Sequence, residues 1–162
     1  MGGKIRLRYE IARKTIREVF KGEKIGVWTN TIKGGVYRNV KSIIRKCCKG
    51  KTGHAARITA SIYINLKKIE DTFILESGFD QVKLNENERI ARTCFRGQKA
   101  HEFIRQGNRP PQSHDITILA EAMILKEEYN EISLYTYDKH FGFFVDEIKK
   151  IVGICVTFCG LQ

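Results

Sequence analysis

The sequence, 162 residues long, has no apolar run approaching the roughly 20 residues that a membrane-spanning helix requires. Its N-terminus also lacks the apolar block that is typical of a signal peptide. These two absences predict a soluble, cytoplasmic protein that does not partner a membrane.

The cysteines and histidines lack the spacing of a zinc site. Five cysteines stand at positions 47, 48, 94, 155 and 159, and no two of them form a Cys-x-x-Cys pair. An odd number without such a pair argues against a disulfide framework as well as against zinc, so we expect mostly reduced, buried thiols. The four histidines show no ligand spacing either; they are His54, His101, His114 and His140.

The sequence also lacks repeats, low-complexity segments and linkers. A chain of this length with 42% hydrophobic residues is long enough to bury a sizeable core. We therefore expect one domain over residues 1–162, with residues 1–22 as a basic helical extension at its N-terminus.

The net charge of +11 is distributed unevenly along the chain. Residues 1–69 hold 18 of the 29 Lys and Arg residues but only three Glu and no Asp. Such a skew favours RNA or another nucleic acid as the partner, because cations that neutralise phosphates supply affinity without reading sequence; the alternative is a solvated basic surface. The candidate nucleic-acid contacts are Arg13, Lys14, Arg17, Asn30, Lys41 and Arg45.

Hydrophobic periodicity predicts alternating helices and strands. Apolar residues recur every three or four positions over residues 5–20, 36–48, 61–76, 85–106, 116–125 and 141–150, which indicates helices, with Gly97 as a break in one of them. Short β-branched or aromatic runs predict strands at residues 24–28, 57–60, 79–84, 132–137 and 153–158. This order predicts an α/β fold, a three-layer α/β/α sandwich with a mostly parallel central sheet.

Two acids stand at the ends of these predicted elements. Asp115 lies in the first turn of the helix that follows Pro110 and Pro111, and Asp138 follows the strand over residues 132–137. Ligands of open α/β sheets bind outside the carboxyl ends of strands, so an acid there has a functional interpretation. Alternatively, both acids merely cap or complement a helix.

The order of elements and two motifs together resemble the PIN-domain family. The motifs are Asp115-Ile-Thr-Ile-Leu-Ala-Glu-Ala on a helix and Thr136-Tyr-Asp-Lys-His-Phe141 after a strand, followed by the apolar run 153–158. The resemblance is good over about residues 110–160. It implies a metal-dependent ribonuclease that cleaves single-stranded RNA, with Mg²⁺ or Mn²⁺ held by Asp115 and Asp138 and with Thr136 as a neighbouring catalytic hydroxyl. The chain could also form a homodimer or bind an inhibitory protein partner.

The sequence departs from the family at two acidic positions. The family's first strand ends in Asp-Thr-Asn, whereas this chain has Trp28, Thr29 and Asn30, and the second acid falls at Asn65. Trp28 is either a core residue or a stacking surface for a base. Glu70 lies more than a turn beyond the family's position, and Glu121 lies on another face of its helix from Asp115.

These departures leave three hypotheses. The first is a PIN-like ribonuclease, and the second is a degenerate PIN-like domain that binds nucleic acid or a protein without cleaving it. The third is a restriction-type nuclease, because Asp138 is followed by Glu147-Ile-Lys149. That pattern requires its Glu and Lys on a strand, whereas residues 141–150 look helical.

Overall fold

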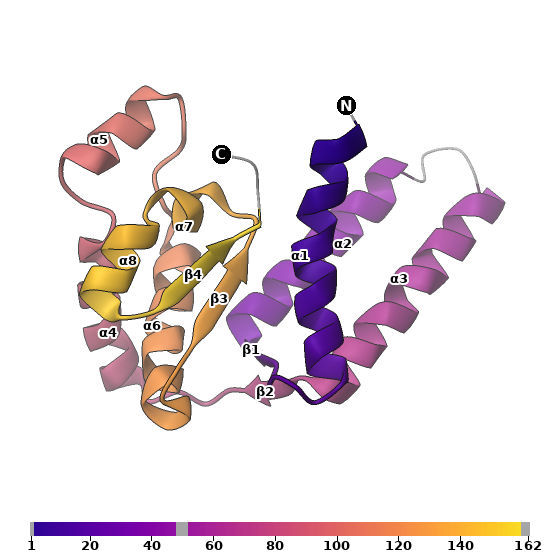
Figure 1. Ribbon diagram of the computed structural model, residues 1–162, viewed down its shortest axis with the longest axis horizontal. Coiled ribbons are helices and arrows are strands. Elements are labelled where there is room, and N and C mark those ends of the chain that lie inside the picture. Colours follow the sequence, from indigo (N-terminus) through magenta and orange to yellow (C-terminus); the bar gives the residue numbers. More distant parts are fainter. Residues whose placement is uncertain (1, 48–51, 160–162) are drawn as a thin grey trace. The chain divides into compact units, whose positions relative to one another are not determined.

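The computed structural model describes residues 2–47 and 52–159 (Figure 1). In chain order the elements are α1 (Gly2–Phe20), β1 (Val27–Thr29), α2 (Asn30–Cys47), α3 (Thr52–Thr72), β2 (Ile74–Glu76), α4 (Gln81–Thr93), α5 (Gln98–Arg105), α6 (Ser113–Tyr129), β3 (Ser133–Thr136), α7 (Lys139–Phe143), α8 (Val145–Val152) and β4 (Cys155–Phe158). None of the helices in these two ranges is both long and apolar enough to cross a membrane.

The expected three-layer α/β/α sandwich is wrong. The structure is 69% helical, and its described residues form eight helices and two separate two-stranded sheets. Both sheets are parallel: β1 pairs with β2, placing Trp28 opposite Leu75, and β3 pairs with β4, placing Leu134 opposite Val156. The described part of the chain therefore has no central sheet that helices could cover on both faces.

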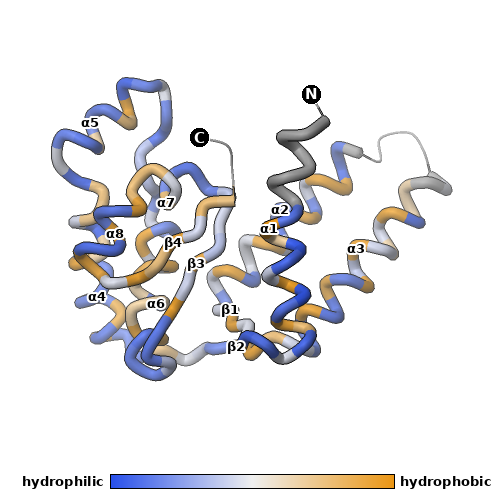
Figure 2. Tube along the Cα trace, viewed as in Figure 1, coloured by the Kyte–Doolittle hydropathy of each residue, from blue (hydrophilic) through white to orange (hydrophobic). Residues whose placement is uncertain are grey.

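The strand expected at residues 57–60 is part of α3. Ile58, Ile62, Leu66 and Ile69 follow one another at intervals of three and four residues, so that the helical period continues through the short run of residues taken for a strand. Of these side chains Leu66 is buried. Figure 2 shows hydrophobic residues recurring between hydrophilic ones along α3.

The strand expected at residues 79–84 is replaced by the start of α4. Asp80 is the N-cap of this helix, and its Oδ1 accepts a hydrogen bond of 2.8 Å from the backbone N–H of Lys83. This bond satisfies one of the N–H groups that a helix start leaves without a partner. Local capping therefore outweighs the alternation of apolar and polar residues that suggested a strand.

Other predicted elements are present with shifted bounds. The helix expected over residues 85–106 is divided into α4 and α5 near Gly97, whose φ of +82° favours glycine. The helix expected at 141–150 is divided into α7 and α8, and its Glu147 and Lys149 lie on α8 rather than on a strand. The last residue of the predicted helix 36–48, Cys48, lies outside the described residues.

The chain divides into two compact units, one of residues 1–14 and 78–162 and one of residues 15–77. In the second unit, Trp28 is buried with its ring edge-on to Phe73, at 6.2 Å between centroids. Glu70 on α3 accepts from Lys33 and from Tyr37 on α2, each at 2.8 Å. The bond from Lys33, and then that from Tyr37, lowers the pKa of Glu70, while the bond to Glu70 raises the pKa of Tyr37.

An aromatic core organises the first unit. Phe144, at the junction of α7 and α8, is fully buried, and its ring contacts those of Phe95, Phe103 and Phe143 at centroid distances of 5.1, 5.5 and 5.3 Å. Leu119 and other buried residues of α4, α6 and α8 complete this cluster. The core therefore fixes α7, the short helix that follows β3, against the neighbouring helices.

Gly142 lets α7 lie close to β4. A Cβ atom at this position would be 2.5 Å from the ring of Phe158, a distance that real side chains do not tolerate. Because α7 and β4 approach each other at a glycine, the N-terminal turn of α7 stays directly beside the carboxyl end of β3.

The buried thiol of Cys94 gives a pH-dependent prediction. Burial raises its pKa from 9.0 to about 11, so at pH 8 the reactive thiolate is about a hundred times rarer than for an unperturbed thiol. We expect iodoacetamide to leave Cys94 unmodified at pH 8 while a small reference thiol reacts, and to modify it after unfolding in guanidinium chloride. Peptide mapping by mass spectrometry measures this, and rapid modification of the folded chain at Cys94 would contradict it.

Candidate metal centre

Asp115 stands in the first turn of α6, where its carboxylate is 1% exposed. Its Oδ2 accepts a hydrogen bond of 2.8 Å from the backbone N–H of Gln112, the N-cap residue. An acid in this position complements the positive end of the helix. The capping contact, however, uses only one of the two carboxylate oxygens.

Asp138 is the N-cap of α7, and its side chain is partly exposed. Its Oδ1 accepts from the backbone N–H of His140 at 2.8 Å. The backbone N–H of Asp138 donates to Oγ1 of Thr136 at 2.9 Å. Thr136, predicted as a catalytic hydroxyl, therefore holds the turn that presents Asp138.

His140, the second residue of α7, is oriented by a backbone carbonyl. Its Nε2 lies 2.9 Å from the carbonyl oxygen of Arg109. A carbonyl oxygen can only accept, so Nε2 carries the hydrogen of this bond. In a neutral imidazole, Nδ1 then carries a lone pair and no proton.

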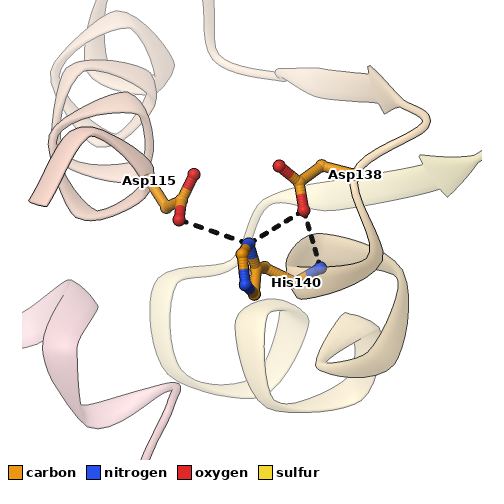
Figure 3. A group of neighbouring side chains, drawn as sticks. All are labelled: Asp115, Asp138 and His140. Carbon is orange, nitrogen blue, oxygen red and sulfur yellow. Dashed lines mark hydrogen bonds and ion pairs between the residues drawn. The ribbon is translucent and has the colours of Figure 1, made fainter. Parts of the chain in front are cut away.

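Three electron-rich atoms converge at this point, as Figure 3 shows. Nδ1 of His140 lies 2.9 Å from Oδ1 of Asp138 and 3.3 Å from Oδ2 of Asp115. Nδ1 nevertheless has no hydrogen bond of acceptable geometry, and neither has Oδ1 of Asp115. A buried polar atom without a hydrogen-bond partner costs free energy, and a cation among the three side chains could offset that cost for Nδ1.

The three side chains fit a small divalent ion. One donor atom from each of Asp115, Asp138 and His140 can be chosen so that all lie within 4.8 Å of one another. Ligands of such an ion with bonds of about 2.0–2.2 Å are about 2.8–3.1 Å apart in an octahedron and about 3.3–3.6 Å apart in a tetrahedron, so the contacts of Nδ1 at 2.9 and 3.3 Å suit one shared ion. The two carboxylates also match the charge of one divalent ion.

Arginine, lysine and histidine side chains adjoin the cluster. His114 Nε2 lies 3.0 Å from Oδ1 of Asp115, and the side chain of His114 is about half exposed. Arg109 and Lys139 are both exposed. The backbone carbonyl of Arg109 is bonded to His140, and Lys139 directly follows Asp138 in the chain. An anionic substrate would therefore meet positive charge beside the carboxylates.

The predicted nucleic-acid contacts are exposed but lie on other elements. Arg13, Lys14 and Arg17 are on α1, while Asn30, Lys41 and Arg45 are on α2. No acid occurs in α2, and Lys41 and Arg45 share a face with Arg38 at helical spacing. Asn30, Lys41 and Arg45 belong to the unit of residues 15–77, whereas the three clustered side chains belong to the other unit.

The family's replaced acidic positions are not part of the cluster. The interpretation of Trp28 as a core residue is confirmed, and Asn65 is exposed on α3. Glu70 bonds Lys33 and Tyr37, and Glu121 is buried on α6 outside the group of Asp115. Glu147 bonds Lys99 on α5 at 2.7 Å, so the restriction-type pattern lacks both its strand and its free acid.

His140 was not among the predicted site residues, because the four histidines have no zinc-ligand spacing in the sequence. The useful signal was the segment Asp138-Lys-His140 itself. An N-cap side chain folds back over the first turn of its helix, which places the residue two positions later beside it.

No family model, curated protein or solved structure matches this chain.

Proposed function

We propose that this chain is a metal-dependent ribonuclease of the PIN-like kind, in which Asp115, Asp138 and His140 hold a divalent ion and the substrate is single-stranded RNA. The resemblance of the two motifs to the PIN-domain family is part of this proposal, and the family's sandwich fold is not. The observation that supports it best is the convergence of the almost completely buried carboxylate of Asp115 with Asp138 and His140, whose buried Nδ1 has no hydrogen-bond partner.

Each clustered residue has a separate task. Asp115 supplies a buried carboxylate in a fixed orientation, because its Oδ2 accepts from the backbone N–H of Gln112. Asp138 is partly exposed and presents its carboxylate on the solvent side. A bound divalent ion would supply a Lewis acid and an activated water for attack on a phosphodiester. Arg109 and Lys139 would attract the phosphate chain towards these residues.

The test is a cleavage assay on a short, end-labelled, single-stranded RNA. The full chain is first freed of metal with a chelator and is then assayed with Mn²⁺, with Mg²⁺ and with EDTA. We expect shortened products only when a divalent ion is present, and slower cleavage of the matched duplex. Products that persist in EDTA, or an absence of products with every ion, would contradict the proposal.

A second function, binding of nucleic acid without cleavage, is supported by the charge of α2. This helix has five cations and no acid, and Arg38, Lys41 and Arg45 are exposed along one face. In that case the same RNA would be retained intact, without a divalent ion, and its affinity would fall steeply with salt. Fluorescence anisotropy at several salt concentrations distinguishes the two functions.

A further inference from the structure

We infer that the cluster of Asp115, Asp138 and His140 is a site for a single ion and that it selects a transition-type ion such as Mn²⁺ over Mg²⁺ and Ca²⁺, with His140 Nδ1 as a ligand. The inference rests on the metal centre of the proposed function and extends it to the identity of the ion. It does not depend on the RNA being cleaved.

The orientation of His140 is that of a metal ligand. Histidines that bind metals donate their other ring N–H to a carboxylate, a carbonyl or water, and this fixes the tautomer and the direction of the lone pair. Here Nε2 donates to the carbonyl of Arg109, and Nδ1 is turned towards both carboxylates. Phe103, whose ring centroid is 5.6 Å from that of His140, restricts the other side of the imidazole.

A proton on Nδ1 explains the cluster less well. A protonated ring would have to direct its N–H at one of the carboxylate oxygens, and neither oxygen meets hydrogen-bond geometry despite distances of 2.9 and 3.3 Å. An ion in contact with all three side chains gives the buried Nδ1 of His140 the partner that it lacks.

The donor set disfavours the hard cations. Ca²⁺ takes six to eight oxygen ligands, and Mg²⁺ prefers oxygen ligands in a regular octahedron and keeps much of its water. Imidazole nitrogen suits the ions of the later transition metals, whereas Mn²⁺ also accepts carboxylates readily. One nitrogen and two carboxylates therefore favour a transition-type ion.

The charge balance favours one ion. Two carboxylates neutralise a single divalent ion, while a second ion would leave a surplus of two positive charges next to Arg109 and Lys139. A neutral site flanked by cations still attracts a phosphate, as the proposed function requires.

The experiment measures ion binding directly. Mn²⁺ is the probe because it is paramagnetic and because carboxylates suit it better than thiols do. The chelator-treated full chain is titrated with Mn²⁺ while free Mn²⁺ is followed by electron paramagnetic resonance, and Mg²⁺ or Ca²⁺ is then added as a competitor. We expect one Mn²⁺ per chain, at least a tenfold preference over Mg²⁺, and nitrogen modulation from a bound imidazole in the pulsed spectrum.

Two substitutions of His140 distinguish the loss of a metal ligand from a loss of folding. His140→Gln should remove the nitrogen modulation and weaken Mn²⁺ binding at least tenfold. His140→Asp exchanges nitrogen for oxygen and should lower the ratio of Mn²⁺ to Mg²⁺ affinity at least tenfold. The matched control is His101→Gln, an exposed histidine of α5, which should bind as the parent does. Circular dichroism tests whether each variant keeps its helices.

Several results would overturn the inference. They are displacement of Mn²⁺ by an equal concentration of Mg²⁺, nitrogen modulation that survives in His140→Gln, and no binding of Mn²⁺ by the folded parent chain. Cleavage of RNA that prefers Mg²⁺ would overturn the inference alone. Selective Mn²⁺ binding through His140 without cleavage of RNA would contradict the proposed ribonuclease activity but not the inference about the ion.

Discussion

Asp138→Asn should reduce the rate of RNA cleavage about a thousandfold. The substitution keeps the shape of the side chain, and asparagine is as good an N-cap as aspartate, so the bond from the His140 N–H and the start of α7 are preserved. It removes one of the two negative charges that hold the ion. Loss of about 4 kcal/mol of transition-state stabilisation, typical of an impaired metal site, corresponds to this factor.

The control for this variant is Asp146→Asn. Asp146 is an exposed acid in the first turn of α8, so the change in net charge is the same and lies in the same unit. Initial rates on single-stranded RNA should match those of the parent. Equal cleavage rates for Asp138→Asn and the parent would show that Asp138 is not part of the catalytic site.

Phe144→Ala should lower the free energy of unfolding by about 3–5 kcal/mol, the usual cost of truncating a buried aromatic ring. Phe144 is 0% exposed, and its ring packs on those of Phe95, Phe103 and Phe143. The cavity would open between α7 and α8, at the end of the helix that carries His140. We therefore expect weaker Mn²⁺ binding as well.

Urea unfolding followed by circular dichroism measures this loss. The matched control is Ile104→Ala, because the side chain of Ile104 is 49% exposed on α5 and its truncation leaves no buried cavity. Its effect should stay within about 0.5 kcal/mol, as is usual for surface substitutions. A loss below about 1 kcal/mol for Phe144→Ala would show that this aromatic cluster is not the core of its unit.

Much of the helical structure could be predicted from local patterns. The apolar stripe of residues 5–20, the break at Gly97 and the helix after Pro111 all correspond to helices or helix ends of the structure. The fold class could not be predicted in the same way. A short β-branched run such as residues 57–60 is compatible with a strand or with a helix. Here the longer helical period on both sides of the run makes it part of a helix.

The candidate site was likewise predictable in part from local patterns. Asp115 and Asp138 were apparent in the sequence, because acids at helix starts follow from local electrostatics and hydrogen bonding. Their convergence on His140 was not, because the ring is oriented by the carbonyl of Arg109, 31 residues earlier, and α7 lies against β4 through Gly142.

The sequence by itself thus determined where most of the helical segments lie, since the helical period depends on neighbours within a turn or two. Only the tertiary structure decided that the strands form two separate pairs and that the buried Asp115 lies beside Asp138 and His140. The physical reason is that burial and the meeting of side chains far apart in the chain depend on how the helices pack, and no local pattern records that packing.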